Sequence, residues 1–307
     1  MTHSSRNRAT DASDWNQRVS FLNGKWGPYS DMQIGVDDIG FRQGVVAVER
    51  LRTYGGAAFL IERHLDRWCH STIELGIDSL PSTERLRDLL EELLVKNQLL
   101  VNEFGEVGIT MFATPGVTVG SPTLGLHLNK IDEDLSASRR QKGQAIVVVN
   151  VHQPDSDCWP RSIKVRSRIH YYRADCLAQE SQQGAAGVLI DDDATVTETS
   201  HSNLAIVEKG RIISPPKDRV LGGITQSKVE ELAMDCGITW TYEGISPQRL
   251  AAADEVLLMG TGTGIWFASE VHGQDSGKSN SPRIPGPIFL ELRDRFDLSC
   301  RSHRESH

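Results

Sequence analysis

The chain has 307 residues, a formal net charge of −8 and 38% hydrophobic residues, which is typical of a globular protein of two compact domains. The negative charge, without a basic stripe, argues against nucleic acid or an anionic membrane as a partner. No apolar run approaches a membrane span, and the polar start has no signal-peptide core. Five dispersed cysteines without metal-ligand spacing favour reduced thiols, so we expect a cytoplasmic protein without a metal site.

The first half of the chain predicts a small α/β domain at residues 19–135, behind a loose polar segment at 1–18. A hairpin is predicted around Asn23 and Gly24, because Asn-Gly is the strongest short hairpin signal. Apolar alternation and helical spacing give the other elements. The predicted strands are 44–54, 57–61, 107–113 and 123–129, and the predicted helices are 62–76 and 83–97.

The second half predicts a larger domain at residues 144–298. The polar and basic stretch 136–143 has no apolar periodicity and is the predicted interdomain connection, while 299–307 is a predicted tail. Lys164 is expected to end a short apolar strand, and residues 277–287 are expected to be rich in turns. The predicted strands are 144–151, 186–191, 210–214, 238–243 and 255–259, and the predicted helices are 171–183, 226–236 and 288–296.

Two stretches rich in glycine and threonine are candidate phosphate sites. Residues 221–225 (Leu-Gly-Gly-Ile-Thr) lead directly into a predicted helix, and residues 260–264 (Gly-Thr-Gly-Thr-Gly) follow a predicted strand. Free backbone N–H groups, hydroxyls and the positive end of a helix suit a phosphate dianion. Either stretch, taken alone, is more often a plain turn or helix cap.

Lys164 and Glu198 add an amine and a carboxylate to these two stretches. Taken alone, Lys164 is an ordinary surface lysine and Glu198 an exposed carboxylate at the end of a strand. Lysine, carboxylate and two phosphate sites, without a nucleotide P-loop, together indicate a cofactor that carries both an aldehyde and a phosphate. Pyridoxal phosphate fits that description.

In this order the motifs resemble those of the fold-type IV, pyridoxal-phosphate-dependent class IV aminotransferases. That group contains branched-chain and D-amino-acid aminotransferases and aminodeoxychorismate lyase. The resemblance implies an α/β (α+β) fold of two domains with the cofactor in the cleft between them, and a homodimer whose partner subunit helps to close the substrate pocket. The resembling stretches are 52–54 (Arg-Thr-Tyr), 62–67 with Ser71, 163–164, 197–203 (Thr-Glu-Thr-Ser-His-Ser-Asn), 221–225, and 253–256 running into 260–261.

The resemblance also implies a role for individual residues. Lys164 would hold the cofactor as an aldimine and move a proton at the substrate Cα, and Glu198 would pair with the pyridine nitrogen. His64 and His201 would pack or form hydrogen bonds, and Asn203 would be structural. The implied phosphate ligands are Arg67, Gly223, Ile224, Thr225, Gly260 and Thr261.

The sequence departs from the family where substrates are chosen. Members often carry an aromatic residue shortly after the lysine, where this chain has Ser-Arg-Ile at 167–169, and branched-chain members carry an arginine on the strand that matches 107–113, which here has none. We predict that Arg42 or Arg168 binds the substrate carboxylate instead, although either arginine can equally be a surface or dimer contact. The remaining candidates are the backbone N–H groups of the loop around Gly262 and Thr263.

The function that follows is transamination between an amino acid, branched-chain-like or D, or an amine, and a 2-oxo acid. A lyase of the aminodeoxychorismate type shares every cofactor residue and is the nearest alternative. A protein that binds pyridoxal phosphate without turnover is the third. Accumulation of the pyridoxamine form after addition of an amino donor separates the transaminase from the other two.

Overall fold

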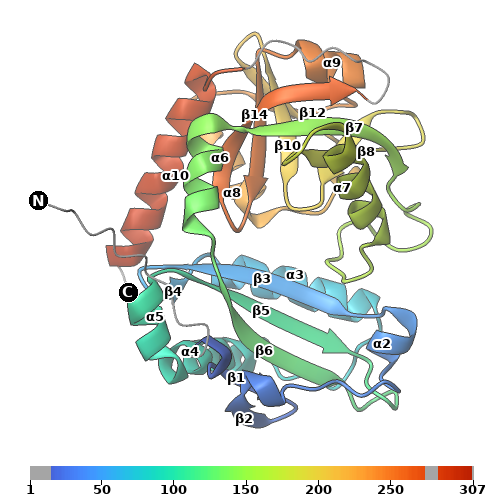
Figure 1. Cartoon of the computed structure of the whole chain (residues 1–307), viewed down its shortest axis with the longest axis vertical. Coiled ribbons are helices and arrows are strands. Elements are labelled where there is room, and N and C mark those ends of the chain that lie inside the picture. The colour runs from blue at the N-terminus through green and yellow to red at the C-terminus, as the bar shows by residue number, and fades with distance from the viewer. Residues whose placement is uncertain (1–14, 274–282, 306–307) are drawn as a thin grey trace, which may run out of the picture.

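The computed structural model describes residues 15–273 and 283–305, which form two α/β domains built on separate sheets (Figure 1). The lower sheet is antiparallel throughout, in the order β2-β1-β6-β5-β3-β4. The turn of the predicted hairpin, at Asn23 and Gly24, joins β1 to β2, and both of its residues have positive φ. The strands are β1 (Val19–Leu22), β2 (Lys25–Pro28), β3 (Ala47–Tyr54), β4 (Ala57–Ala58), β5 (Val107–Thr114) and β6 (Thr123–Lys130).

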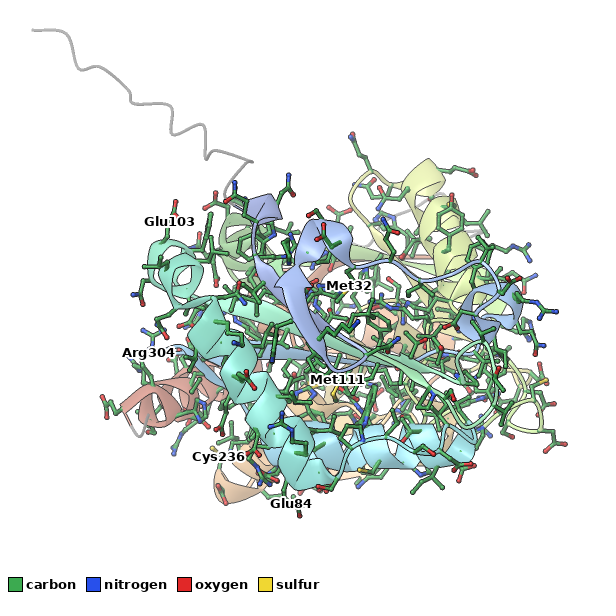
Figure 2. All side chains as sticks on the ribbon, turned by 90° about the horizontal axis from the view of Figure 1, so that it is seen from below. Met32, Glu84, Glu103, Met111, Cys236 and Arg304 are labelled. Carbon is green, nitrogen blue, oxygen red and sulfur yellow. The ribbon has the colours of Figure 1, made fainter. Side chains whose placement is uncertain are left out.

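The lower domain's helices cover one face of its sheet. Helix α4 begins at the side chain of Ser82, which accepts a hydrogen bond from the Arg85 N–H at 3.3 Å, and its leucines face the core. Figure 2 looks at this domain from below, with Glu84 marking α4 and Glu103 marking α5. The helices are η1 (Tyr29–Asp31), α2 (Ile39–Gln43), α3 (Ile61–Glu74), α4 (Thr83–Lys96) and α5 (Gln98–Phe104).

The upper sheet has the order β12-β11-β10-β13-β14-β7-β8-β9, and a further pairing joins β9 to β10. That pairing sets Glu198 opposite Asn203 and closes six of the strands into a ring, from which β11 and β12 extend. The predicted carboxylate therefore lies where the ring closes. The strands are β7 (Gln144–His152), β8 (Ala186–Ile190), β9 (Val196–Thr199), β10 (Asn203–Glu208), β11 (Arg211–Ser214), β12 (Trp240–Tyr242), β13 (Glu255–Gly260) and β14 (Gly264–Gly273).

Apolar side chains inside this ring form one core, and helices cover its outer surface with two more. Helix α10 runs down the side of the upper domain to the lower one (Figure 1), where Arg304 forms an ion pair with Glu106. None of the described helices is both long and apolar enough to cross a membrane. The helices are α6 (Glu133–Lys142), α7 (Ile169–Ser181), η2 (Lys217–Arg219), α8 (Ile224–Asp235), α9 (Pro247–Ala252) and α10 (Pro287–Glu305).

Most elements predicted from apolar periodicity are confirmed with small shifts of their ends. The predicted strand at 57–61 is wrong beyond Ala58, because Leu60 takes a left-handed conformation with φ of 52° and starts α3. Lys164 does not end a strand, since the chain there pairs only through a single bridge between Ala47 and Val165. Among the described residues, α2, α5, α9, β9, β10 and β14 were not predicted.

Three segments predicted to be loose or irregular are ordered. Trp15 is 8% exposed and packs edge-on against Phe104 at 5.1 Å, which anchors residues 15–18. The stretch 136–143 lies largely in α6, whose Asp132 cap, acidic first turn and basic last turn replace an apolar stripe as the source of helix stability. Helix α10 continues through most of the predicted tail, with Cys300 buried. Much of the predicted turn-rich stretch, at 274–282, lies outside the described residues.

Candidate active site

Residues from both domains line a cavity of about 60 Å³. The lower domain contributes one arginine from α3, and the upper domain contributes the loop before α7, the end of β9, and the two stretches rich in glycine and threonine. The structure thus brings together every residue that the sequence assigned to the cofactor. These residues are Arg67, Lys164, Glu198, Gly223, Ile224, Thr225, Gly260 and Thr261.

Lys164 lies in the loop between β7 and α7, and its backbone is fixed on both sides. Its N–H donates to Ser71 Oγ at 3.0 Å, and its carbonyl accepts from the Val48 N–H at 3.0 Å. No described residue hydrogen-bonds the amine. Burial, together with the positive charge of Arg67, lowers the pKa of Lys164 to about 8, although the nearby Glu49 carboxylate opposes the shift. A substantial fraction of this amine is therefore neutral near physiological pH.

Glu198 faces the same cavity and accepts hydrogen bonds from four groups. The Tyr171 hydroxyl donates to Oε1 at 2.6 Å, and the Gln153 amide donates to Oε1 at 3.0 Å. The Asn203 amide donates to Oε2 at 3.0 Å, and the Leu221 N–H lies 3.3 Å from both oxygens. Burial raises the pKa of Glu198, while these donors and the Lys164 amine oppose the rise. A cationic N–H partner from the cavity would favour the ionised carboxylate.

The start of α8 is open toward the cavity. Its N-cap is Gly223, so no side chain caps the helix and its first N–H groups are left for a ligand. A Cβ on Gly223 would collide with the Asn203 side chain, and a Cβ on Gly260 would collide with the His201 carbonyl. Within the described chain, the hydroxyls of Thr225 and Thr261 make no hydrogen bond. Backbone N–H groups and free hydroxyls together suit a phosphate.

Arg67 lies at the edge of this candidate phosphate site, where Glu49 holds its guanidinium. Glu49 was missed by the sequence analysis. The Arg67 Nε donates to Glu49 Oε1 at 2.6 Å, its Nη2 to Oε2 at 2.8 Å, and its Nη1 to the Gly222 carbonyl at 2.8 Å. His64 Nδ1 lies 2.8 Å from Glu49 Oε2. Burial alone would raise the pKa of Glu49, but Arg67 and His64 lower it to about 2. The available signal was a carboxylate within the buried run of β3.

His64 is a hydrogen-bonding residue, as predicted. Burial lowers the pKa of His64, although Glu49 opposes the shift. The imidazole is therefore neutral and donates its Nδ1 proton to the Glu49 carboxylate. Tyr171 and Gln153, which hold Glu198, were also missed as site residues, because nothing in their local sequence indicates a carboxylate partner.

The four candidates for the substrate carboxylate have different surroundings. Arg168 lines the cavity, donates to the Ser200 carbonyl and lies over the Tyr171 ring at 4.3 Å. Arg42 is exposed on α2 and does not line this cavity, because α2 packs against β5 at the far end of the lower sheet. Within the described chain Arg42 therefore lies away from this cavity, and its role as a ligand of the substrate carboxylate stays a prediction.

Gly262 and Thr263 lie beside a second cavity rather than in the first. The Gly262 carbonyl accepts a hydrogen bond from Arg52, and the Thr263 N–H donates to the Gly260 carbonyl at 3.3 Å. The internal turn of the loop uses the Thr263 N–H, which is then not available for a carboxylate. Of the described residues, only Thr261 borders both cavities.

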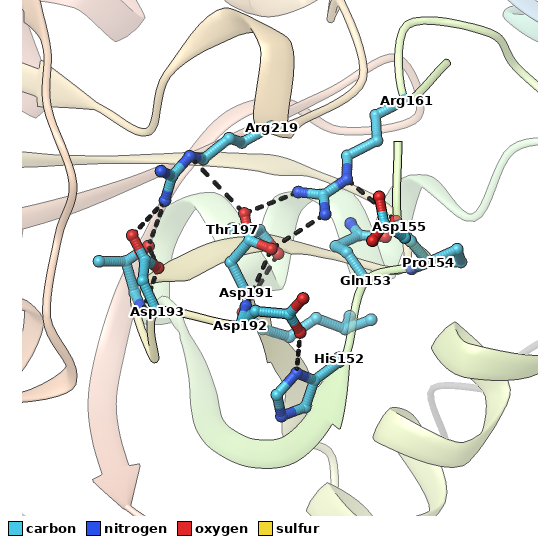
Figure 3. A network of polar contacts seen from close by, with 12 residues as sticks. His152, Gln153, Pro154, Asp155, Arg161, Asp191, Asp192, Asp193, Thr197 and Arg219 are labelled. Atoms are coloured by element: carbon cyan, nitrogen blue, oxygen red, sulfur yellow. Dashed lines mark hydrogen bonds and ion pairs between the residues drawn. The ribbon is translucent and has the colours of Figure 1, made fainter. Parts of the chain in front are cut away.

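An ion-pair network supports the Lys164 loop from behind (Figure 3). Arg161 donates to both Asp191 oxygens, at 2.7 and 2.9 Å, and to the Pro154 carbonyl at 3.0 Å. Arg219 approaches Asp191 at 3.7 Å from the other side. The network joins both ends of the loop between β7 and Lys164, and Gln153, which bonds Glu198, directly precedes Pro154 in this loop.

Comparison with known proteins connects this geometry to a family. The family model for amino-transferase class IV matches residues 47–271. A putative branched-chain-amino-acid aminotransferase of Methanocaldococcus jannaschii is 28% identical over 289 residues, which is 90% of this chain and 94% of that protein. A D-alanine aminotransferase of Bacillus licheniformis is 25% identical over 284 residues, which is 92% of this chain and 96% of that protein.

Solved structures share the fold. The branched-chain aminotransferase of Escherichia coli superposes with a TM-score of 0.83 at 20% identity, covering 92% of this chain and 94% of that one. An aminotransferase from Brucella abortus bound to the co-factor PLP gives a TM-score of 0.79 at 18% identity, covering 92% and 99%. Because the family match spans most of the sequence, from residue 47 to 271, this chain belongs to the amino-transferase class IV family.

Proposed function

We propose that the chain binds pyridoxal phosphate in the 60 Å³ cavity and transfers an amino group between an amino acid and a 2-oxo acid. The proposal rests on one observation: Lys164, Glu198 and the uncapped start of α8 line the same cavity. Pyridoxal phosphate, when bound, supplies a ring that accepts the negative charge developing at the substrate Cα. Its bound form in the similar Brucella abortus aminotransferase supports the same choice of cofactor.

Lys164 is the proposed covalent anchor and proton carrier. Its pKa of about 8 leaves a usable neutral fraction at neutral pH, and a neutral amine is required both for attack on an aldehyde and for taking a proton from Cα. Hydrogen bonds to Ser71 and Val48 fix the Lys164 backbone on both sides, so its side chain moves from a fixed Cα. General-base work of this kind contributes about 10²–10⁴-fold to a rate.

Glu198 is the proposed partner of the pyridine nitrogen. It is 4% exposed and held by four donors, so its oxygens keep one orientation. Burial raises the pKa of Glu198, and a cationic N–H beside it would offset this effect and favour the ionised carboxylate. The carboxylate would thus keep the ring nitrogen protonated through the reaction.

The proposed phosphate site combines the first N–H groups of α8 with side chains on either side. Ile224 and Thr225 supply N–H groups at the positive end of the helix, and the free hydroxyls of Thr225 and Thr261 add two donors. Arg67 brings a charge that Glu49 holds in place from the opposite side. Gly223 and Gly260 leave room for close approach of the backbone.

A homodimer with the domains at 19–135 and 144–298 is part of the proposal. Exposed apolar side chains occur in the stretch 34–41, which leads into α2, and in the turn between β5 and β6, and others lie in the first turn of α7. Patches of this kind mark contact surfaces. The residues are Ile34, Val36, Phe41, Val117, Val119, Ile169 and Tyr172. The described cysteines are all free, which supports a reducing compartment such as the cytoplasm.

The test is an absorbance spectrum of the purified protein, repeated after addition of single L- and D-amino acids. The branched-chain and D-alanine enzymes among its relatives make valine, leucine and alanine of both hands the first donors to try. A transaminase accumulates the pyridoxamine form when no 2-oxo acid is present. A lyase would release a product and return to its starting spectrum, and a protein without turnover would show no spectral change with any donor.

A further inference from the structure

A third cavity, of about 440 Å³, lies between the two domains and adjoins the first. One wall is α3 of the lower domain, and the other is formed by η2, the start of α8 and the end of β12. It shares Arg67 and most of the turn 221–224 with the first cavity, but neither Lys164 nor Glu198 lines it. Its volume lies within the range of pockets that hold small ligands, about 300–1,000 Å³.

Part of the wall of this third cavity is apolar. Val220, Leu221 and Ile224 contribute aliphatic side chains, and Tyr242 contributes an aromatic ring. Val220 is 3% exposed, so packing fixes its place in the wall. The Tyr242 hydroxyl donates to Glu230 at 2.5 Å, which holds the ring in one orientation. The upper domain therefore offers a ligand an apolar surface made of one ring and several branched side chains.

Several polar groups that α3 presents to this cavity already have partners among the described residues. Those partners are Glu231 for Arg63, Glu49 for Arg67 and Ser162 for His70, at 2.7, 2.6 and 2.8 Å. A carboxylate thus neutralises each of the two arginines. For this reason the arginines do not make the cavity a site for an anion alone.

Two opposite charges in the wall remain available to a ligand. Asp66, on α3, makes no hydrogen bond or ion pair within the described chain. The Lys217 side chain, on η2, is 71% exposed, and its ammonium lies 3.8 Å from Glu230, which is too far for a hydrogen bond, and over the Tyr242 ring at 4.6 Å. The Gly222 N–H is a further donor without a partner in the described residues. Because α3 and η2 belong to different domains, the carboxylate and the ammonium lie on different walls of the cavity.

We propose that this third cavity binds an amino acid with an apolar side chain as an intact zwitterion. The α-ammonium pairs with Asp66, the α-carboxylate with Lys217 and the Gly222 N–H, and the side chain covers the apolar surface. A ligand with one charge would leave either Asp66 or Lys217 without a partner, and an uncharged apolar ligand would leave both. Since Lys164 does not line the cavity, the amino acid does not react there. The inference goes beyond the proposed function, because this binding requires neither cofactor nor turnover.

Titration calorimetry with each hand of α-methylleucine tests the site. This amino acid has no hydrogen on Cα and cannot be transaminated, and the holoenzyme is first treated with borohydride so that Lys164 keeps its cofactor. Asp66→Asn and Lys217→Met should each weaken binding of the tighter hand about fivefold, the factor that corresponds to an ion pair open to solvent. Both side chains are exposed, so neither substitution should impair folding.

Two analogues of this ligand separate its charges. 4-Methylpentanoate lacks the ammonium, and 3-methylbutylamine lacks the carboxylate, so both should bind more weakly than α-methylleucine. Asp66→Asn should not change the binding of 4-methylpentanoate, and Lys217→Met should not change that of 3-methylbutylamine. Asp88→Asn and Lys209→Met are the matched controls, because both residues are exposed and lie outside this cavity. Each control should bind α-methylleucine as the wild type does.

The outcomes separate this inference from the proposed function. If α-methylleucine does not bind, or binds equally to the wild type, Asp66→Asn and Lys217→Met, the inference is wrong and transamination is unaffected. Equal binding of α-methylleucine and its two analogues would show that the cavity does not recognise the zwitterion, which also overturns the inference. The same titrations are carried out on the protein freed of cofactor. They therefore decide the inference even if no donor produces the pyridoxamine form and the proposed function fails.

Discussion

Arg67 and Glu49 form a two-point ion pair in which Nε lies 2.6 Å from Oε1 and Nη2 lies 2.8 Å from Oε2. The carboxylate is completely buried, and the third nitrogen of the guanidinium reaches the Gly222 carbonyl across the interdomain cleft. One strand of the lower domain thus determines where a cation lies beside the proposed phosphate site of the upper domain. The geometry of this proposed site depends on Glu49, which does not itself line the cavity.

Glu49→Gln should weaken cofactor binding and lower stability. Removing one partner of a buried ion pair typically costs about 3–5 kcal/mol, because the remaining charge stays buried without compensation. Equilibrium dialysis of pyridoxal phosphate and urea unfolding of the cofactor-free protein measure the two effects. Glu62→Gln is a suitable control, since Glu62 pairs with Arg87 at the surface. Losses of equal size in both variants would contradict the role given to Glu49.

The same carboxylate predicts how stability depends on pH. The pKa of Glu49 is about 2 in the folded chain, below its ordinary value of 4.5. Its contribution is therefore fully present above pH 4.5 and is lost as the pH falls toward 2, by up to about 3 kcal/mol. Urea unfolding of the cofactor-free protein between pH 6 and pH 3 should show this loss, and it should be smaller in Glu49→Gln.

Lys164→Met should abolish the covalent linkage that borohydride traps, and with it the half-reaction. The cofactor-free variant should nevertheless be more stable than the wild type near pH 7, by up to about 3 kcal/mol, because the folded chain lowers the pKa of this lysine from 10.5 to about 8. In the wild type this penalty disappears as the pH rises from 8 to 10.5. Covalent attachment to a different lysine would refute the assignment.

Glu198→Gln should retain the cofactor and slow proton transfer at Cα by several orders of magnitude. The neutral amide no longer stabilises a protonated ring nitrogen, and the loss is largest where negative charge develops. Stopped-flow spectra of the half-reaction measure it. Tyr171→Phe is the graded comparison: it removes one 2.6 Å hydrogen bond to Glu198 and should cost about 1.5–3 kcal/mol, or roughly tenfold to a hundredfold in rate.

Arg161→Gln should loosen the loop that carries Lys164. Arg161 supplies both bonds to Asp191 and one to Pro154, with about 10% of each charged side chain exposed. We expect slower cofactor loading and a Tm lower by several degrees, while the covalent linkage still forms. Arg219→Gln should have a smaller effect, because its contact with Asp191 is longer, at 3.7 Å, and its side chain is more exposed. Calorimetry and the rate of reconstitution check both.

The sequence predicted the cofactor residues well because each belongs to a short motif whose function is local. A helix start at Gly223, or a carboxylate in the run 197–203, keeps its chemistry wherever the fold puts it. Glu49, Tyr171 and Gln153 could not be predicted in the same way, since their importance arises from contacts across the chain. The position of Arg42 away from the cavity is likewise set by the tertiary fold.

Secondary structure followed a similar division. Elements with a clear apolar stripe, such as α4 at Thr83–Lys96, were predicted within a residue or two. Helix α6 depends on its Asp132 cap and on charge placement, so apolar periodicity carried no signal for it. The segment around Lys164 contains strand-like residues, but the lower domain pairs with it through a single bridge, from Ala47 to Val165. Its preference for a strand is therefore not realised, because it lacks a neighbouring strand to pair with along its length.

Helix α10 acts as a strut between the domains. Phe296 approaches Gly264, at the end of the loop that carries Thr261, so closely that a Cβ there would lie 2.8 Å from its ring, and Phe59 of the lower domain packs against the same Phe296 at 5.9 Å. About two turns further along α10, His303 packs on Phe59 and Arg304 reaches Glu106. A hinge motion that opened the cleft would require α10 to lose its contacts with one of the two domains. We therefore expect the cleft to keep a constant width, so that substrates enter and leave through its mouth without a separation of the two domains.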